Sequence, residues 1–137
     1  MTGVMRRVAA GLATLLAVAI VVQFYLAASA AFDTAPKEES FQAHRALGYV
    51  ILLLALLSTA ACALARLPGR LVGMAALVAG LGVLQPVIRL VAAAFDDAGG
   101  GSTRTGVLVF GLHALNGLLM MGLAATVSRR ARAGSSP

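Results

Sequence analysis

Four long apolar stretches dominate this chain and limit what it can fold into. They are rich in Leu, Val and Ala, and they cover residues 8–32, 44–65, 71–95 and 106–127. A helix rises about 1.5 Å per residue, so about 20 apolar residues cross the hydrocarbon core of a bilayer, which is about 30 Å thick. Only closed, hydrogen-bonded helices fit such stretches, because backbone polar groups find no water at that depth. The sequence therefore predicts an all-α, polytopic membrane protein in which four transmembrane helices form an up-down bundle.

The composition agrees with this class of protein and argues against a soluble one. Hydrophobic residues make up 60% of the chain and charged residues 12%, whereas soluble domains contain about 25% charged residues. The length of 137 residues leaves room for one domain, covering residues 1–137. The net charge of +6 could indicate a nucleic-acid partner, but the basic residues flank apolar runs and follow no solvated face. We therefore expect the lipid bilayer as a partner and no nucleic acid.

Charged residues separate onto the two ends of the predicted bundle. One end, the arginine end, carries no acidic residue and seven arginines, namely Arg6, Arg7, Arg66, Arg70, Arg129, Arg130 and Arg132. The other end, the acidic end, carries all five acidic residues in the connections at residues 33–41 and 96–104. An excess of arginine marks the cytoplasmic side of a membrane protein. We expect a multi-pass protein of the cytoplasmic membrane, with its N-terminus and C-terminus in the cytoplasm.

The first apolar stretch has one alternative interpretation. Arg6, Arg7, the apolar run and the small residues Ala28-Ser29-Ala30 together resemble a cleavable signal peptide. The apolar core of a signal peptide covers about 7–15 residues, and this run is longer. We therefore expect the first helix to remain in the protein.

The two predicted helical hairpins resemble each other in sequence. Gln23 lies nine residues before a Phe-Asp pair, and Gln85 lies ten residues before another. The second stretch contains His-Arg-Ala-Leu-Gly from His44, and the fourth contains His-Ala-Leu-Asn-Gly from His113. These matches fit two parallel hairpin repeats related by an axis along the membrane normal. An alanine-rich chain also produces such matches by chance, so both explanations stay open.

Polar side chains inside the apolar stretches are the candidates for function, because burying them in lipid costs free energy. They are Gln23, His44, Gln85, Arg89, His113 and Asn116. The stretches contain no acidic residue, which argues against a proton-coupled transporter. We name no catalytic residue, and an enzymatic role is left without support.

Two histidines, His44 and His113, are the only ones in the chain, and each lies toward the acidic end of its helix. A glycine follows each histidine by four residues, at Gly48 and Gly117, where a flat ligand could approach the backbone. Two facing imidazoles are the axial ligands of a six-coordinate haem, and helix bundles hold cofactors in their cores. We therefore predict haem b as a candidate cofactor, with His44 and His113 as its metal ligands.

Three arginines could complete this candidate site. Arg45, Arg89 and Arg104 all lie toward the acidic end. A guanidinium group pairs well with a carboxylate, so these side chains could hold the haem propionates.

One geometric objection stands against a haem between the histidines. His44 lies 22 residues before Arg66, whereas His113 lies 16 residues before Arg129. If these arginines mark one membrane boundary, the histidines differ in depth by about 9 Å.

Simpler interpretations of the polar residues also remain open. His44 could be an interfacial residue at the membrane boundary, and His113 could form a hydrogen bond between helices. Gln23 and Gln85 could form interhelical hydrogen bonds as well, each worth about 0.6–2 kcal/mol. Cys62 lies deep in the second stretch, and we expect it to be a small packing residue.

Two short segments resemble motifs of haem A synthase. The segment Ala43-His44-Arg45-Ala46-Leu47-Gly48-Tyr49 resembles the His-Arg motif of that family, and Leu112-His113-Ala114-Leu115-Asn116-Gly117 resembles its even-helix histidine motif. Each half of that family is a four-helix unit with histidines on its second and fourth helices, so the resemblance implies haem binding by His44 and His113. The acidic residue and the cysteine pair of the family are absent here, and synthase chemistry is not implied. The whole chain is also similar to a domain-of-unknown-function family of short four-span bacterial membrane proteins, which implies architecture alone.

Three functions are therefore open at the level of the sequence. The first is a structural or accessory four-helix membrane protein, with a membrane-protein partner or as a homo-oligomer. The second is a bis-histidine haem-b protein that transfers electrons or carries haem. The third is a small-molecule transporter or a quinone-binding protein.

Overall fold

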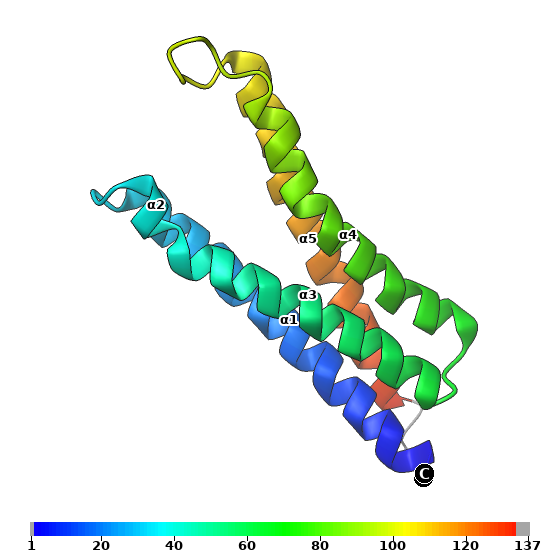
Figure 1. Cartoon of the computed structure of the whole chain (residues 1–137). Coiled ribbons are helices and arrows are strands. Elements are labelled where there is room, and N and C mark those ends of the chain that lie inside the picture. The colour runs from blue at the N-terminus through cyan, green and yellow to red at the C-terminus, as the bar shows by residue number, and fades with distance from the viewer. Residues whose placement is uncertain (1, 134–137) are drawn as a thin grey trace.

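The structure is a computed structural model, and it describes residues 2–133 of the chain (Figure 1). Its helices are α1 (Thr2–Phe32), α2 (Lys37–Ser40), α3 (Gln42–Leu64), α4 (Gly69–Ala93) and α5 (Arg104–Ala133). All but the short α2 are long and apolar enough to cross a membrane. The predicted all-α fold with four membrane-spanning helices is confirmed.

The helices extend beyond the predicted apolar spans, chiefly at the arginine end. α1 already includes Thr2, six residues before the predicted start at residue 8, and α5 continues to Ala133 instead of residue 127. Arginine is a good helix former whose charge needs water or lipid headgroups. Hydropathy therefore marks where the hydrocarbon ends, whereas the helix itself continues into the headgroup region.

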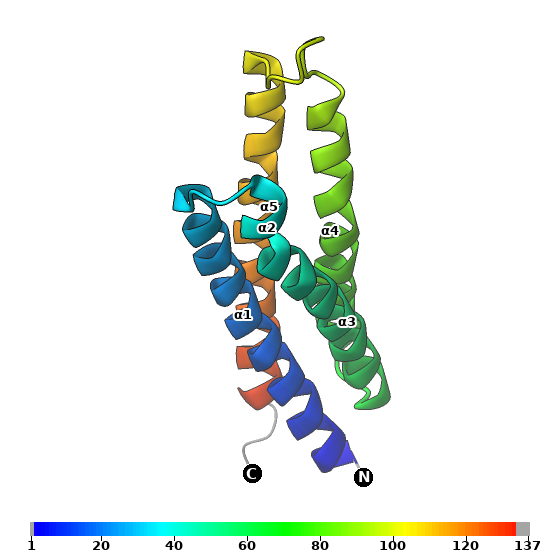
Figure 2. The same ribbon diagram turned by 60° about the vertical axis from the view of Figure 1, so that its left-hand side comes forward.

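The four long helices form a ring of neighbours. α1 packs against α3 and α5, and α4 packs against the same two helices, so α3 and α5 lie diagonally opposite each other. Figures 1 and 2 show two hairpins, α1–α3 and α4–α5, which lie together at the arginine end and separate toward the acidic end. The bundle is thus closed at one end and open at the other.

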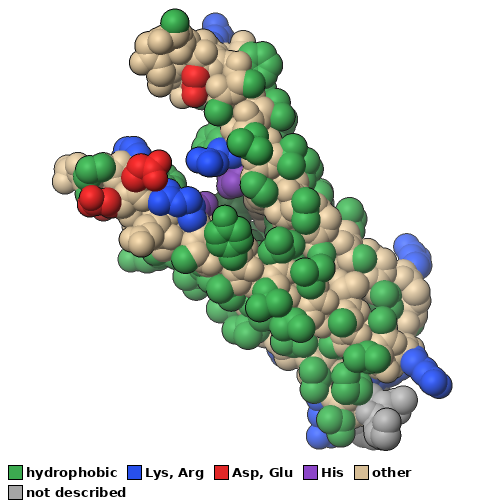
Figure 3. All heavy atoms as spheres, viewed as in Figure 1, with side chains coloured by type: hydrophobic (Ala, Val, Ile, Leu, Met, Phe, Trp, Pro, Cys, Tyr) green, Lys and Arg blue, Asp and Glu red, His purple; other side chains and the backbone are tan. Residues whose placement is uncertain are grey.

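Buried apolar side chains fill only part of the length of this bundle. One cluster lies toward the arginine end and includes Ala13 and Cys62, and a second lies in the middle and includes Leu16 and Val78. Cys62 is fully buried, as expected for a packing residue. Beyond these clusters the space-filling view shows a hollow between the hairpins, with the histidine side chains at its floor (Figure 3). We call this hollow the fork.

The outward faces of the long helices are apolar and exposed. Leu15, Leu53, Leu77 and Leu118, one from each long helix, are between 49% and 56% exposed. Exposing such a large apolar surface to water is unfavourable for a monomer, whereas contact with lipid tails is favourable. This surface supports a membrane-embedded bundle.

The connection between α3 and α4 forms a Schellman-type helix end. Arg66 adopts a positive φ of 52°, and the Leu67 N–H donates to the Cys62 carbonyl at 3.1 Å. Arg66 thus occupies the left-handed position, while Pro68 caps α4 and Gly69 begins it.

The connections at the acidic end are organised by aspartates. Asp97 Oδ1 accepts the N–H groups of Gly99 and Gly101 at 2.9 and 2.8 Å, which folds the glycine-rich loop between α4 and α5. Asp33 Oδ1 accepts the Ala35 N–H at 3.1 Å just after α1, and this hydrogen bond lowers the pKa of Asp33. Short side chains of this kind end helices by replacing backbone partners.

Candidate functional site

The two histidines of the chain meet at the floor of the fork. His44 lies on α3 and His113 on α5, the two diagonally opposite helices. Their ring centroids are 6.2 Å apart and their ring planes are inclined at 44°. Residues that are 69 positions apart in the sequence are therefore near neighbours across the centre of the bundle.

Each histidine is held by a backbone carbonyl of the preceding helix in its own hairpin. His44 Nδ1 lies 3.2 Å from the Gln23 carbonyl oxygen, and His113 Nδ1 lies 3.3 Å from the Gln85 carbonyl oxygen. A carbonyl can only accept, so both Nδ1 atoms must donate their hydrogen. Both rings then carry the lone pair on Nε2, which is the arrangement that prepares a histidine to bind a metal ion.

The side chain of Gln23 makes the interhelical contact that the sequence suggested. Its Nε2 donates to the His44 carbonyl oxygen at 2.9 Å and lies 3.4 Å from His44 Nε2. The second contact is long, and a metal ion at His44 Nε2 would replace it. Asn116 also bridges two helices, since its Nδ2 donates to the Leu81 carbonyl at 2.8 Å.

The amide oxygens of Gln23 and Gln85 are buried without a hydrogen-bond partner in the described part of the chain. A buried amide oxygen without a partner costs about 1–3 kcal/mol. The two glutamines occupy equivalent places in the two hairpins, so the same unfavourable free energy arises in both.

The two glycines receive these glutamine side chains. A Cβ at Gly48 would lie 3.4 Å from Gln23 Nε2, and one at Gly117 would lie 3.4 Å from Gln85 Nε2. At Gly117 it would also approach Phe24 to 3.0 Å. The sequence indicated glycines that leave room for a flat ligand, whereas in this structure the room is taken by neighbouring side chains.

Aromatic rings flank both histidines, and the sequence analysis did not identify them. Phe41 meets His44 edge-on with centroids 5.7 Å apart, and Phe110 stacks on His113 at 5.2 Å. Each phenylalanine precedes its histidine by three residues, so a shared Phe-x-x-His pattern was the available signal. It extends the likeness between the two hairpins by one further pair of equivalent residues.

The predicted difference in depth between the histidines is wrong. The ring centroids of the two histidines are 6.2 Å apart in all, which is less than the predicted difference of about 9 Å in depth. The objection assumed that Arg66 and Arg129 mark one level. In fact Arg66 lies beyond the end of α3, whereas α5 continues past Arg129.

The three candidate arginines are placed differently around the site. The Arg45 guanidinium donates to the Glu38 backbone carbonyl and lies 3.8 Å from the Glu38 carboxylate, so it is engaged with α2. Arg104 begins α5, nine residues before His113, which is about 14 Å along the helix. Arg89 follows Gln85 by four residues on α4, one turn above the carbonyl that holds His113. Figure 3 shows basic side chains at the mouth of the fork. Because Arg45 is engaged with Glu38 and Arg104 lies about 14 Å along α5, Arg89 is the best placed of the three.

The donor groups that this site brings together are two imidazoles. Within the described residues there is no group of three or more His, Cys, Asp or Glu side chains that could hold a bare metal ion. Structural zinc sites take four protein ligands, and catalytic ones take three. A haem iron would need only two protein ligands. His44 and His113, whose ring centroids are 6.2 Å apart, would be the residues that hold it.

Comparisons with known proteins identify a family but no activity. No curated protein and no solved structure matches this chain significantly, so the likeness to haem A synthase gains nothing from them. A family model described as a family of unknown function (DUF6220) matches residues 23–94. The matched segment includes Gln23, His44 and Gln85 and ends before His113. The match covers more than half of the chain, which therefore belongs to the family of unknown function DUF6220.

Proposed function

We propose that this integral membrane protein binds haem b between His44 and His113 at the floor of the fork. The observation that carries the proposal is the pair of imidazoles on diagonal helices, 6.2 Å apart, each oriented by a backbone carbonyl on Nδ1. Bound haem would supply one-electron redox chemistry, so the protein would transfer electrons or carry haem at the acidic end.

The residues of the chain have distinct tasks in this proposal. His44 and His113 would supply their Nε2 lone pairs to the iron, and the carbonyls of Gln23 and Gln85 keep the rings in the tautomer that can bind. Arg89 supplies a positive charge near the mouth of the fork for a propionate group. The apolar clusters below the histidines keep water from reaching the floor from the arginine end.

The orientation of the protein in the membrane forms part of the proposal. All five acidic residues lie at the end that holds the fork, and the opposite end holds seven arginines. By the positive-inside rule the fork opens to the outer side of the cytoplasmic membrane, and both termini lie in the cytoplasm.

The test is an optical and paramagnetic resonance spectrum of the detergent-purified full-length protein after expression with added haem. We expect sharp low-spin bands in the reduced-minus-oxidised spectrum, and their loss in both His44→Ala and His113→Ala. Tyr49→Ala and Leu112→Ala are matched controls, because these exposed residues lie on the same helices and face away from the bundle core. The controls should keep the wild-type spectrum.

Two results would count against the proposal. A colourless wild-type protein that is folded and has been offered haem would exclude the cofactor and leave a structural or accessory bundle. Spectra that survive in either histidine variant would show that the haem is held elsewhere.

A further inference from the structure

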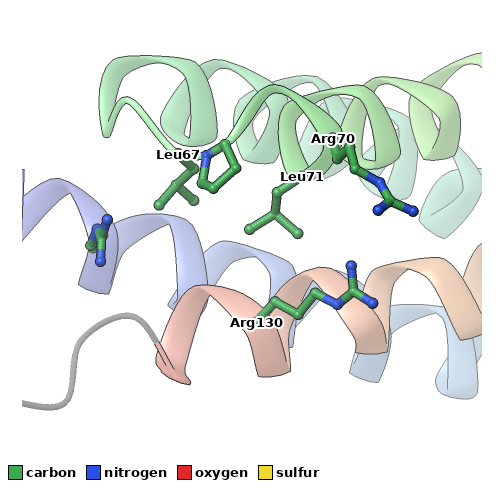
Figure 4. Close-up of a pocket in the computed structure, with 6 residues that line it drawn as sticks. Leu67, Arg70, Leu71 and Arg130 are labelled. Carbon is green, nitrogen blue, oxygen red and sulfur yellow. The ribbon is translucent and has the colours of Figure 1, made fainter.

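The arginine end of the bundle contains a cavity that is separate from the fork. It has a volume of about 250 Å³ and is lined by Arg6, Leu67, Pro68, Arg70, Leu71 and Arg130. Figure 4 shows Leu67 and Leu71 pointing into it, while Arg70 and Arg130 reach toward each other across its edge. Residues from α1, α4, α5 and the α3–α4 connection therefore converge on one small space.

Arg70 and Arg130 bring positive charge to the cavity from α4 and α5. All five Asp and Glu residues belong to the opposite, acidic end. Neighbouring arginines at this end bond to hydroxyl groups instead, since Arg132 donates to Thr14 at 2.6 Å and Arg129 to Thr126 at 3.1 Å. Like charges that converge in this way favour an anion between them.

The rest of the lining is apolar, and this decides the kind of anion. Leu67 and Leu71 are 8% and 5% exposed, so they form a packed apolar floor under the arginines. The cavity also adjoins the start of α4, where the first N–H groups of a 25-residue helix add to the positive potential. An apolar floor with a basic rim, at the level where the hydrocarbon ends, suits an amphipathic molecule that has a phosphate group and an apolar part.

We propose that this cavity binds the phosphate headgroup of an anionic phospholipid. Guanidinium groups of Arg70 on α4 and Arg130 on α5 hold the phosphate oxygens, and the glycerol region contacts Leu67 and Leu71. The site would fix these two helices to one lipid molecule at the closed end of the bundle. It is independent of the fork and of any cofactor there.

The test measures thermal unfolding of the full-length protein in detergent while a lipid or salt is added. The probes are phosphatidylglycerol, phosphatidylcholine and inorganic phosphate. Phosphatidylglycerol should raise the melting temperature of the wild type at much lower concentration than the other two. In the double variant Arg70→Gln/Arg130→Gln its apparent affinity should fall by about fivefold for each arginine removed.

The control variant is Arg7→Gln/Arg129→Gln, which removes the same charge from exposed arginines at the same end that do not line the cavity. It should keep the wild-type response. Arg70→Lys/Arg130→Lys keeps the charge, and it should bind with intermediate affinity even if the glutamine variant folds poorly.

Three outcomes would overturn the proposal. Phosphatidylglycerol could fail to stabilise the wild type, or both double variants could lose the response equally, which would mean a diffuse surface charge. Inorganic phosphate could stabilise as well as the lipid does, which would identify a site for a free anion.

Discussion

The paired glutamines allow a quantitative test of the packing at the fork. Gln23 and Gln85 occupy equivalent positions, and each has a buried amide oxygen without a partner in residues 2–133. They differ in the contacts of Nε2, because Gln23 Nε2 donates to the His44 carbonyl at 2.9 Å and also lies 3.4 Å from His44 Nε2. No such bond is found for the Gln85 side chain in that range. Replacing each by leucine removes the unpaired oxygen in both cases, so that gain cancels in the comparison.

The difference between Gln23→Leu and Gln85→Leu therefore measures the hydrogen bond. Interhelical hydrogen bonds in membrane proteins are worth about 0.6–2 kcal/mol, so Gln23→Leu should be less stable than Gln85→Leu by about 1 kcal/mol. For a chain of this size that corresponds to a difference of about 4 °C in melting temperature. Thermal unfolding of both variants in the same detergent, without haem, is the assay. Equal melting temperatures, or a lower one for Gln85→Leu, would refute the reasoning.

Three further predictions follow from the structure. Gly106→Ala should destabilise the protein by about 1–3 kcal/mol, because its Cβ would lie 3.0 Å from the Ala92 carbonyl oxygen. A Cβ at Gly111 meets nothing within 4 Å, so Gly111→Ala should be neutral or stabilising. Thermal unfolding of both variants is the measurement. If haem is bound, Arg89→Gln should speed its loss to apomyoglobin several-fold more than Arg104→Gln does, and equal rates would contradict the assignment of Arg89. A membrane-impermeant maleimide should label Ser102→Cys in intact cells but Gly69→Cys only after permeabilisation. The reverse labelling pattern would invert the proposed topology. Cys62 is buried, so it should contribute no background labelling.

The sequence predicts the positions of the helices far better than it predicts their ends and the contacts between them. Hydropathy finds the spans because twenty or more apolar residues have few alternatives to a membrane helix. It does not find the ends, since Arg6 and Arg130 are helical although they are charged. The same limitation produced the error in the depths of the two histidines, because Arg129 was counted as a boundary and lies within α5.

The candidate site was predictable in part. His44 and His113 stand out as the only histidines in two apolar spans, and the Phe-x-x-His spacing at Phe41 and Phe110 is visible in the sequence. The hydrogen bonds from each Nδ1 to a glutamine carbonyl were not predictable, because they depend on the register between neighbouring helices. The separation of the hairpins at the acidic end was also beyond the sequence, since apolar residues continue through that region of all four spans.

The open end of the bundle explains why polar side chains gather at one level. A bundle packed by alanine and leucine along its whole length would leave Gln23, Gln85 and the histidines without a reason to be buried. Here they lie where the apolar clusters end, and the lone pairs of two imidazoles and two amides share that level. Under the haem proposal, such a floor would suit the positive iron centre, and Arg89 near the mouth would suit a carboxylate of the cofactor. A simple packing role would account for the hydrogen bonds of each hairpin separately, but it gives no reason for two imidazoles from diagonal helices to lie 6.2 Å apart.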